Sequence, residues 1–147
     1  MKPTIASFVA ALVATFVLSI LMVAKAQMGL MPELNVIRML AGQMNAGPAT
    51  GWMAHVLIGV VGYGLAHALV FRRLPFGGHV MRGVLLGLAG WLVMMIAVMP
   101  MAGAGLFGLN LGPMVPVATF MLHLIFGLVL GASYCFLHSS AGEAATA

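Results

Sequence analysis

The chain has 147 residues, of which 63% are hydrophobic and 5% are charged, and its mean hydropathy is +1.17. Soluble domains carry roughly 25% charged residues. Six Lys or Arg and two Asp or Glu side chains cannot cover a soluble surface. A net charge of +4, spread along the chain, also makes no basic patch for nucleic acid. The composition therefore excludes a soluble fold and a nucleic-acid partner, and it predicts an integral membrane protein surrounded by lipid.

Four apolar segments of about 20 residues each are long enough to cross a hydrocarbon core of roughly 30 Å as helices. They run unbroken without alternating polarity, which favours helices over barrel strands. The first also resembles a signal peptide because Ala24-Lys25-Ala26 is a small-x-small sequence, but its length favours a retained helix. We predict an all-α membrane protein with one four-helix domain over residues 1–138 and a flexible polar tail over 139–147. The four segments are 5–24, 51–71, 80–99 and 115–137.

The basic residues divide unequally between the two sides of this four-helix topology. One side holds Lys2 and the three arginines between residues 72 and 82, and the other holds Lys25 and Arg38. Positive residues are in excess on the cytoplasmic side of membrane proteins. We therefore expect both termini to be cytoplasmic, in a bacterial inner membrane.

The two outer connections are not plain hydrophilic loops. Within residues 32–40, Leu34, Ile37 and Leu40 recur at helical spacing beside the polar Glu33 and Arg38, which predicts a short helix at the membrane interface. The second connection, 101–114, is uncharged and rich in glycine, and we expect it to enter the membrane edge or to pack against the first.

An internal repeat relates the second and fourth segments. Both follow the order N-x-G-P, A-T, M-x-H and H-x3-G, starting at Asn45 and at Asn110. The pattern predicts two helical hairpins, with halves of about 1–72 and 73–138. Spans two and four run in the same direction, so the halves would be related by a pseudo-two-fold axis along the membrane normal. His55 and His123 become equivalent positions.

Small residues predict which helices pack closely. Spans two, three and four carry glycines at helical spacing, and such residues let helix backbones approach in lipid. The first segment has no glycine between Ile5 and Ala24. We therefore expect it to be the helix that faces lipid or a partner.

His55 and His123 are candidate functional residues because an ionisable group inside a membrane span is rarely without a role. One interpretation is structural: each neutral imidazole bonds a hydroxyl or carbonyl on a neighbouring helix. The other is that the two imidazoles ligate a single b-type haem, with Gly59 and Gly127 leaving room for the macrocycle. His67 lies twelve residues after His55, so a regular helix would point the two rings about 120° apart.

A copper site is a further alternative. Most of the 14 methionines fall in the outer half of this topology, and thioether sulfur suits Cu(I). The candidate ligands are Met53, Met99, Met101 and Met121. Methionine also fills irregular gaps between helices, which needs no metal.

The stretch from Met28 to Ala132 contains GLMPELNVIRML and MPMAGAGLFGLNLGP, and it resembles a bacterial family of small four-span membrane proteins of unknown function. The resemblance implies a bacterial inner-membrane location but no activity. Because the sequence carries no recognisable catalytic motif, we expect a non-enzymatic accessory or assembly subunit of a larger, plausibly respiratory, membrane complex. Its partners would be other membrane subunits or further copies of itself.

Overall fold

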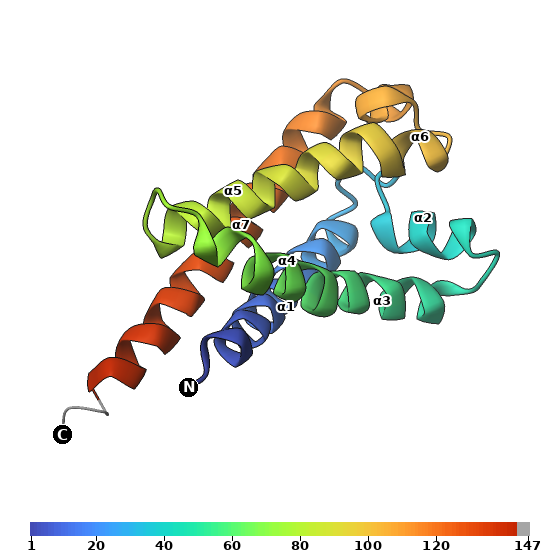
Figure 1. The fold of residues 1–147 in the computed structure, drawn as a ribbon. Coiled ribbons are helices and arrows are strands. Elements are labelled where there is room, and N and C mark those ends of the chain that lie inside the picture. The colour runs from blue at the N-terminus through green and yellow to red at the C-terminus, as the bar shows by residue number, and fades with distance from the viewer. Residues whose placement is uncertain (144–147) are drawn as a thin grey trace.

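The computed structural model describes residues 1–143, with side chains up to residue 138, and this part of the chain is helical without strands. Figure 1 shows the long helical segments and, at the end opposite the N-terminus, a short helix and a looped connection. The elements are α1 (Pro3–Gln27), α2 (Val36–Gln43), α3 (Pro48–Leu57), the π-helix η1 (Ile58–Gly62), α4 (Tyr63–Leu69), the 3-10 helix η2 (Phe71–Arg73), α5 (His79–Val93), the π-helix η3 (Met94–Val98), α6 (Met99–Met101), the 3-10 helix η4 (Leu106–Leu111) and α7 (Met114–Glu143).

The four predicted spans are confirmed as helices long and apolar enough to cross a membrane. They cover Pro3–Gln27, Pro48–Arg73, His79–Met101 and Met114–His138, so each predicted segment lies inside a slightly longer helix. The tail predicted over residues 139–147 is helical in its first part, because α7 continues to Glu143. Residues 139–143 are therefore helical, and the remainder of the predicted tail, 144–147, lies outside the described residues.

Spans three and four pack most closely because glycine removes the side chains between them. The ideal Cβ position of Gly127 on α7 lies 2.6 Å from the carbonyl oxygen of Gly83 on α5. One turn further along, a Cβ on Gly131 would be 2.7 Å from the Cα of Val80. No side chain larger than hydrogen fits such gaps, so the two backbones touch over several turns.

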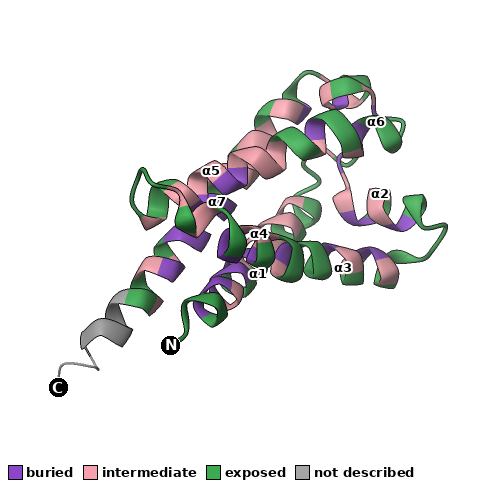
Figure 2. Cartoon of the chain, viewed as in Figure 1, coloured by how far each residue is buried: buried purple, intermediate pink, exposed green. Residues whose placement is uncertain are grey.

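The expectation that α1 is the helix that faces lipid or a partner applies to one of its sides only, because α1 is as buried as span four. One side of α1 is fully buried against α7 and α4, and it is built from alanines, which serve the same packing purpose as glycine in lipid. The opposite side exposes Leu12, Phe16 and Ile20, and Figure 2 shows the two sides as alternating purple and green. The buried alanines are Ala6, Ala10, Ala11 and Ala14.

Spans two and three diverge. Their backbones approach each other near the connection between them, through α4, η2 and α5, and further along only the Tyr63 ring reaches across to Gly90 of α5. Helix α1 contacts both α7 and the η1–α4 segment. Figure 1 shows α3 and α5 running apart toward the end that carries α2 and α6. Perfect pseudo-two-fold symmetry would make the α1–α7 and the span two–span three contacts alike, and they are not alike. The two-hairpin repeat with halves 1–72 and 73–138 stays a prediction.

The outer connections pack on each other and on the ends of the spans. Leu34 from the first connection shares a buried cluster with Ala104 from the second and with Met95, Met99 and Val115. The short helix predicted within residues 32–40 begins later, at Val36, because the Asn35 side chain accepts a hydrogen bond from the Arg38 backbone N–H at 2.9 Å and caps the first turn. Helix α2 then lies along α3, burying Ile37 and Ala41.

Candidate ligand cavity

The divergence of spans two and three leaves a partly open cavity of about 1050 Å³ between them. Its wall includes residues of α1, α2, α3, η1, α4, α5 and α7. Along span two it extends from Pro48 to Ala66, eighteen residues or about 27 Å of helix at 1.5 Å per residue. Pockets that hold small molecules have volumes of about 300–1,000 Å³ and mostly apolar walls. This cavity therefore has the size of a ligand site.

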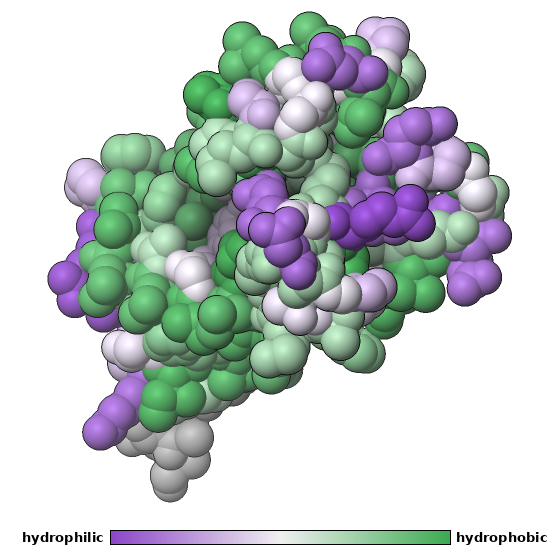
Figure 3. All heavy atoms as spheres, turned by 90° about the vertical axis from the view of Figure 1, so that its right-hand side faces the viewer, coloured by the Kyte–Doolittle hydropathy of each residue, from purple (hydrophilic) through white to green (hydrophobic). Residues whose placement is uncertain are grey.

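The polar groups of the wall are few and unevenly placed. Lys25 and Arg38 lie at the end of the cavity beside α2, His55 and His123 lie deeper, and Tyr63 lies deeper still. Figure 3 looks at the end of the molecule that carries α2 and α6, and it shows polar side chains gathered among apolar ones on this face. An apolar wall with a small number of polar groups is typical of a binding site for an apolar or amphipathic molecule.

His55, on α3, is tied to α1. Its Nε2 lies 3.1 Å from the Ser19 hydroxyl, which is itself 2.7 Å from the Thr15 carbonyl oxygen. The hydroxyl has one hydrogen, and it donates that hydrogen to the carbonyl, so the Nε2–H of the imidazole donates to the Ser19 oxygen. The ring also packs edge-on against Trp52, with centroids 5.7 Å apart. This is the structural interpretation of His55 given by the sequence, and it leaves Nδ1 as the unprotonated nitrogen.

His123, on α7, is oriented by its own helix. Its Nδ1 lies 2.9 Å from the Thr119 carbonyl oxygen, so Nδ1–H donates there and Nε2 keeps a bare lone pair. Histidines that bind metals commonly have one ring N–H fixed by a carbonyl in this way. The structure thus brings His55 and His123 to one cavity wall on different helices, and His123 is the better oriented as a ligand.

The two glycines predicted to make room for a macrocycle serve different purposes. Gly59 lines the cavity, but its ideal Cβ position lies 2.7 Å from Thr15 Cγ2, so it also lets α1 approach span two. Gly127 lies against the α5 backbone and is not part of the cavity wall. The space beside Gly127 is filled by protein and offers no room for a ligand.

The four methionines predicted as copper ligands do not line the cavity. Met53 and Met101 are more than 70% exposed, Met121 is 48% exposed, and Met99 is fully buried in the cluster between the outer connections. Within the described residues, no group of three or more His, Cys, Asp or Glu side chains is placed to hold a metal ion. The arrangement of these side chains gives no support to a copper site.

Sequence reasoning missed the seam between α1 and span two. His67 is fully buried and its Nδ1 lies 3.0 Å from the Ser7 hydroxyl, so two Ser–His pairs, Ser19–His55 and Ser7–His67, connect the same two helices. The shared twelve-residue spacing of the serines and of the histidines was the available signal.

The predicted divergence of His55 and His67 by about 120° is wrong because a π-turn separates them. The π-helix η1 (Ile58–Gly62) lies between the two histidines. A π-turn takes up one extra residue, so the pair behaves as if eleven residues apart, which is about 20° from three full helical turns. Both rings can then face α1.

The fold and the cavity define a multi-pass helical membrane protein with a partly open, mostly apolar chamber between its spans. A protein-family model, that of the family of unknown function DUF6789, matches residues 1–144, and the chain belongs to this family. The match extends the resemblance seen over residues 28–132 to almost the whole sequence. No curated protein and no solved structure matches the chain.

Proposed function

We propose that the protein is a non-enzymatic accessory subunit of a larger membrane complex, to which it contributes a chamber for an apolar small molecule. The observation that carries the proposal is the cavity of about 1050 Å³ between spans two and three. A helical membrane protein gains stability from close packing, so two spans that splay apart along an apolar chamber need something to fill it.

We place the protein in a bacterial inner membrane with both termini in the cytoplasm. The start of α1, the end of α7 and the connection that carries Arg72 and Arg73 share one end of the molecule, as Figure 1 shows. Arg82 lies near the start of α5 and donates hydrogen bonds to the carbonyls of Arg72 and Phe76, so its positive charge also belongs to this end. The positive-inside rule supports this orientation.

The test is purification of the tagged chain from its native membrane in a mild detergent, followed by native electrophoresis and mass spectrometry of the organic extract. We expect the chain to migrate with a larger assembly and to retain an apolar molecule in stoichiometric amount. A stable monomer that retains nothing would overturn the proposal.

A second candidate is that the retained molecule is a b-type haem, and the specific observation in its favour is the orientation of His123. Its Nδ1–H is fixed on the Thr119 carbonyl and its Nε2 lone pair is bare at the cavity wall. His55 would first have to release Ser19 before Nε2 could act as the second ligand. The visible spectrum decides: haem gives a Soret band that His123→Ala abolishes and that Ser19→Ala preserves. A preparation without a Soret band excludes this candidate.

A further inference from the structure

The geometry points to one class of occupant for the chamber, an anionic phospholipid. Its head group would lie at the outer mouth of the cavity and one acyl chain would run inward, and this inference rests on the proposed function. Three features of the wall carry this inference. They are the length of the cavity, the charge at its outer end and the apolar character of its inner part.

The cavity is elongated along the membrane normal. On span two its wall runs from Pro48 to Ala66, and Phe71 continues it toward the inner end. On α1 it runs from Gln27 to Thr15. Because these helices cross the membrane, a molecule filling the cavity spans roughly half of the bilayer or more. An acyl chain has that shape, whereas a compact solute would fill only part of the space.

The outer mouth is positively charged. Lys25 donates from Nζ to the carbonyl oxygens of Met31 and Leu34, at 3.0 and 2.6 Å, which fixes the ammonium beside the mouth with one N–H left over. Arg38 on α2 is exposed and lines the same end. Glu33 lies near Lys25 and offsets one charge. Two cations against one carboxylate leave the mouth with a net positive charge, which suits an anionic head group.

The inner part of the cavity carries no charged side chain among its lining residues. Tyr63 and Phe126 stack edge-on there, with ring centroids 4.6 Å apart, and Ala66, Phe71 and Leu86 complete the wall. A free phosphate or another small anion would gain nothing from this surface. A phospholipid matches both ends of the cavity, because its head group meets the charged mouth and its acyl chain meets the apolar inner wall. Each CH₂ of the chain that is buried there contributes about 0.8 kcal/mol.

The experiment is native mass spectrometry of the protein in nanodiscs that contain equal amounts of phosphatidylglycerol and phosphatidylcholine. We expect wild type to retain one phosphatidylglycerol. Arg38→Gln should reduce the retained ratio of anionic to zwitterionic lipid by about fivefold, the value of one basic residue near a head group. Arg38→Lys should restore it. Arg73→Gln is the matched control because Arg73 is exposed at the opposite end and does not line the cavity.

The outcomes separate this inference from the proposed function. Retention of both lipids in equal amount, unaffected by Arg38→Gln, would overturn the head-group assignment while the chamber itself still holds an apolar molecule. Retention of no lipid, together with a native extract free of any apolar molecule, would overturn the proposed function as well.

Discussion

The hydroxyl groups of α1 decide how the buried histidines are satisfied. His67 donates from Nδ1 to Ser7, and its Nε2 has no partner among the described residues, whereas His55 lies on the cavity wall. The sequence predicted that a neutral imidazole could bond a hydroxyl on a neighbouring helix, but it gave no pairing. The pairing depends on the register between α1 and span two, which the π-turn η1 alters and which hydropathy does not report.

Ser7→Ala is expected to cost more stability than Ser19→Ala. Loss of the Ser7 hydroxyl leaves both nitrogens of a fully buried imidazole without a partner, a penalty of about 1–2 kcal/mol. Loss of the Ser19 hydroxyl costs less because His55 lines the cavity, so a polar group that enters the cavity can bond its imidazole instead. Thermal unfolding in detergent measures the difference. The double substitution Ser7→Ala with His67→Leu removes both partners and should recover much of the loss, and equal effects of the two serine variants would contradict this account.

At the scale of the helices, small residues determine which spans touch. The glycines of spans three and four were visible in the sequence, and the close α5–α7 contact agrees with them. The alanines of α1 were not recognised as a packing surface, because alanine is common in membrane helices of any orientation. The divergence of spans two and three could not be predicted either, because it depends on how all four spans pack together and no local sequence pattern reports it.

Gly127→Val is expected to destabilise the α5–α7 pair by about 1–3 kcal/mol, as overpacking of a close contact does. The added side chain would meet the backbone of Gly83 and Val84, which cannot move aside as a flexible side chain can. Unfolding temperature in detergent reports the effect. Ala132→Val on the same helix is the matched control, because Ala132 is exposed and lies outside the chamber wall. If both variants were equally destabilised, the close backbone contact would not be the cause.

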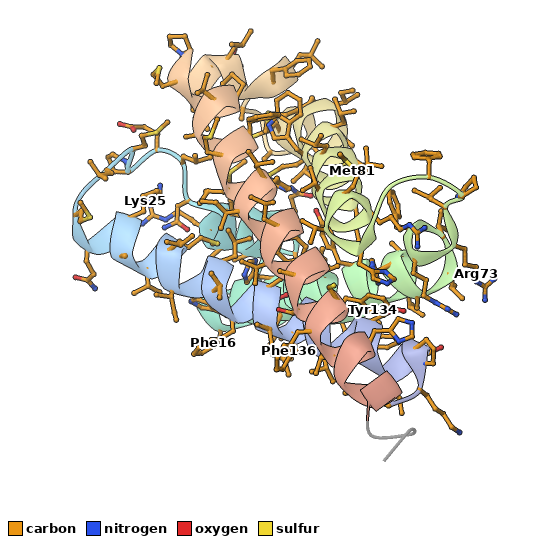
Figure 4. All side chains as sticks on the ribbon, turned by 90° about the vertical axis from the view of Figure 1, so that its left-hand side faces the viewer. Phe16, Lys25, Arg73, Met81, Tyr134 and Phe136 are labelled. Carbon is orange, nitrogen blue, oxygen red and sulfur yellow. The ribbon has the colours of Figure 1, made fainter. Side chains whose placement is uncertain are left out.

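At the scale of the whole molecule, the apolar surface and the charge at each end determine how the protein sits in a bilayer. Figure 4 shows Phe16 and Phe136 on the face formed by α1 and α7, and both side chains are more than 60% exposed. Arg73 points away from the bundle at the end that carries the N-terminus, whereas Lys25 lies toward the opposite end of the molecule, in the last turn of α1. Composition and the spacing of the apolar segments predicted the four spans because lipid imposes a length and a polarity on each. The cavity depends on the three-dimensional arrangement and left no local signal.

The orientation can be tested with single cysteines in a variant whose only native cysteine, Cys135, is replaced by alanine. A cysteine at Gln43, exposed at the end of α2, should react with a membrane-impermeant maleimide added outside intact spheroplasts. A cysteine at Pro75, exposed in the connection between spans two and three, should react only after the membrane is opened. The reverse pattern would move the mouth of the cavity to the cytoplasmic side.

Native mass spectrometry of wild type beside Gly62→Leu asks whether the chamber between spans two and three holds an apolar molecule. Gly62 lines the chamber and has open space at its Cβ, so leucine enters the chamber without displacing backbone. Val61→Leu adds bulk at the next position, which is exposed and outside the wall. Wild type and Val61→Leu should carry a bound mass that Gly62→Leu lacks, with all three equally folded. The same bound mass in all three, or none in any, would contradict the account.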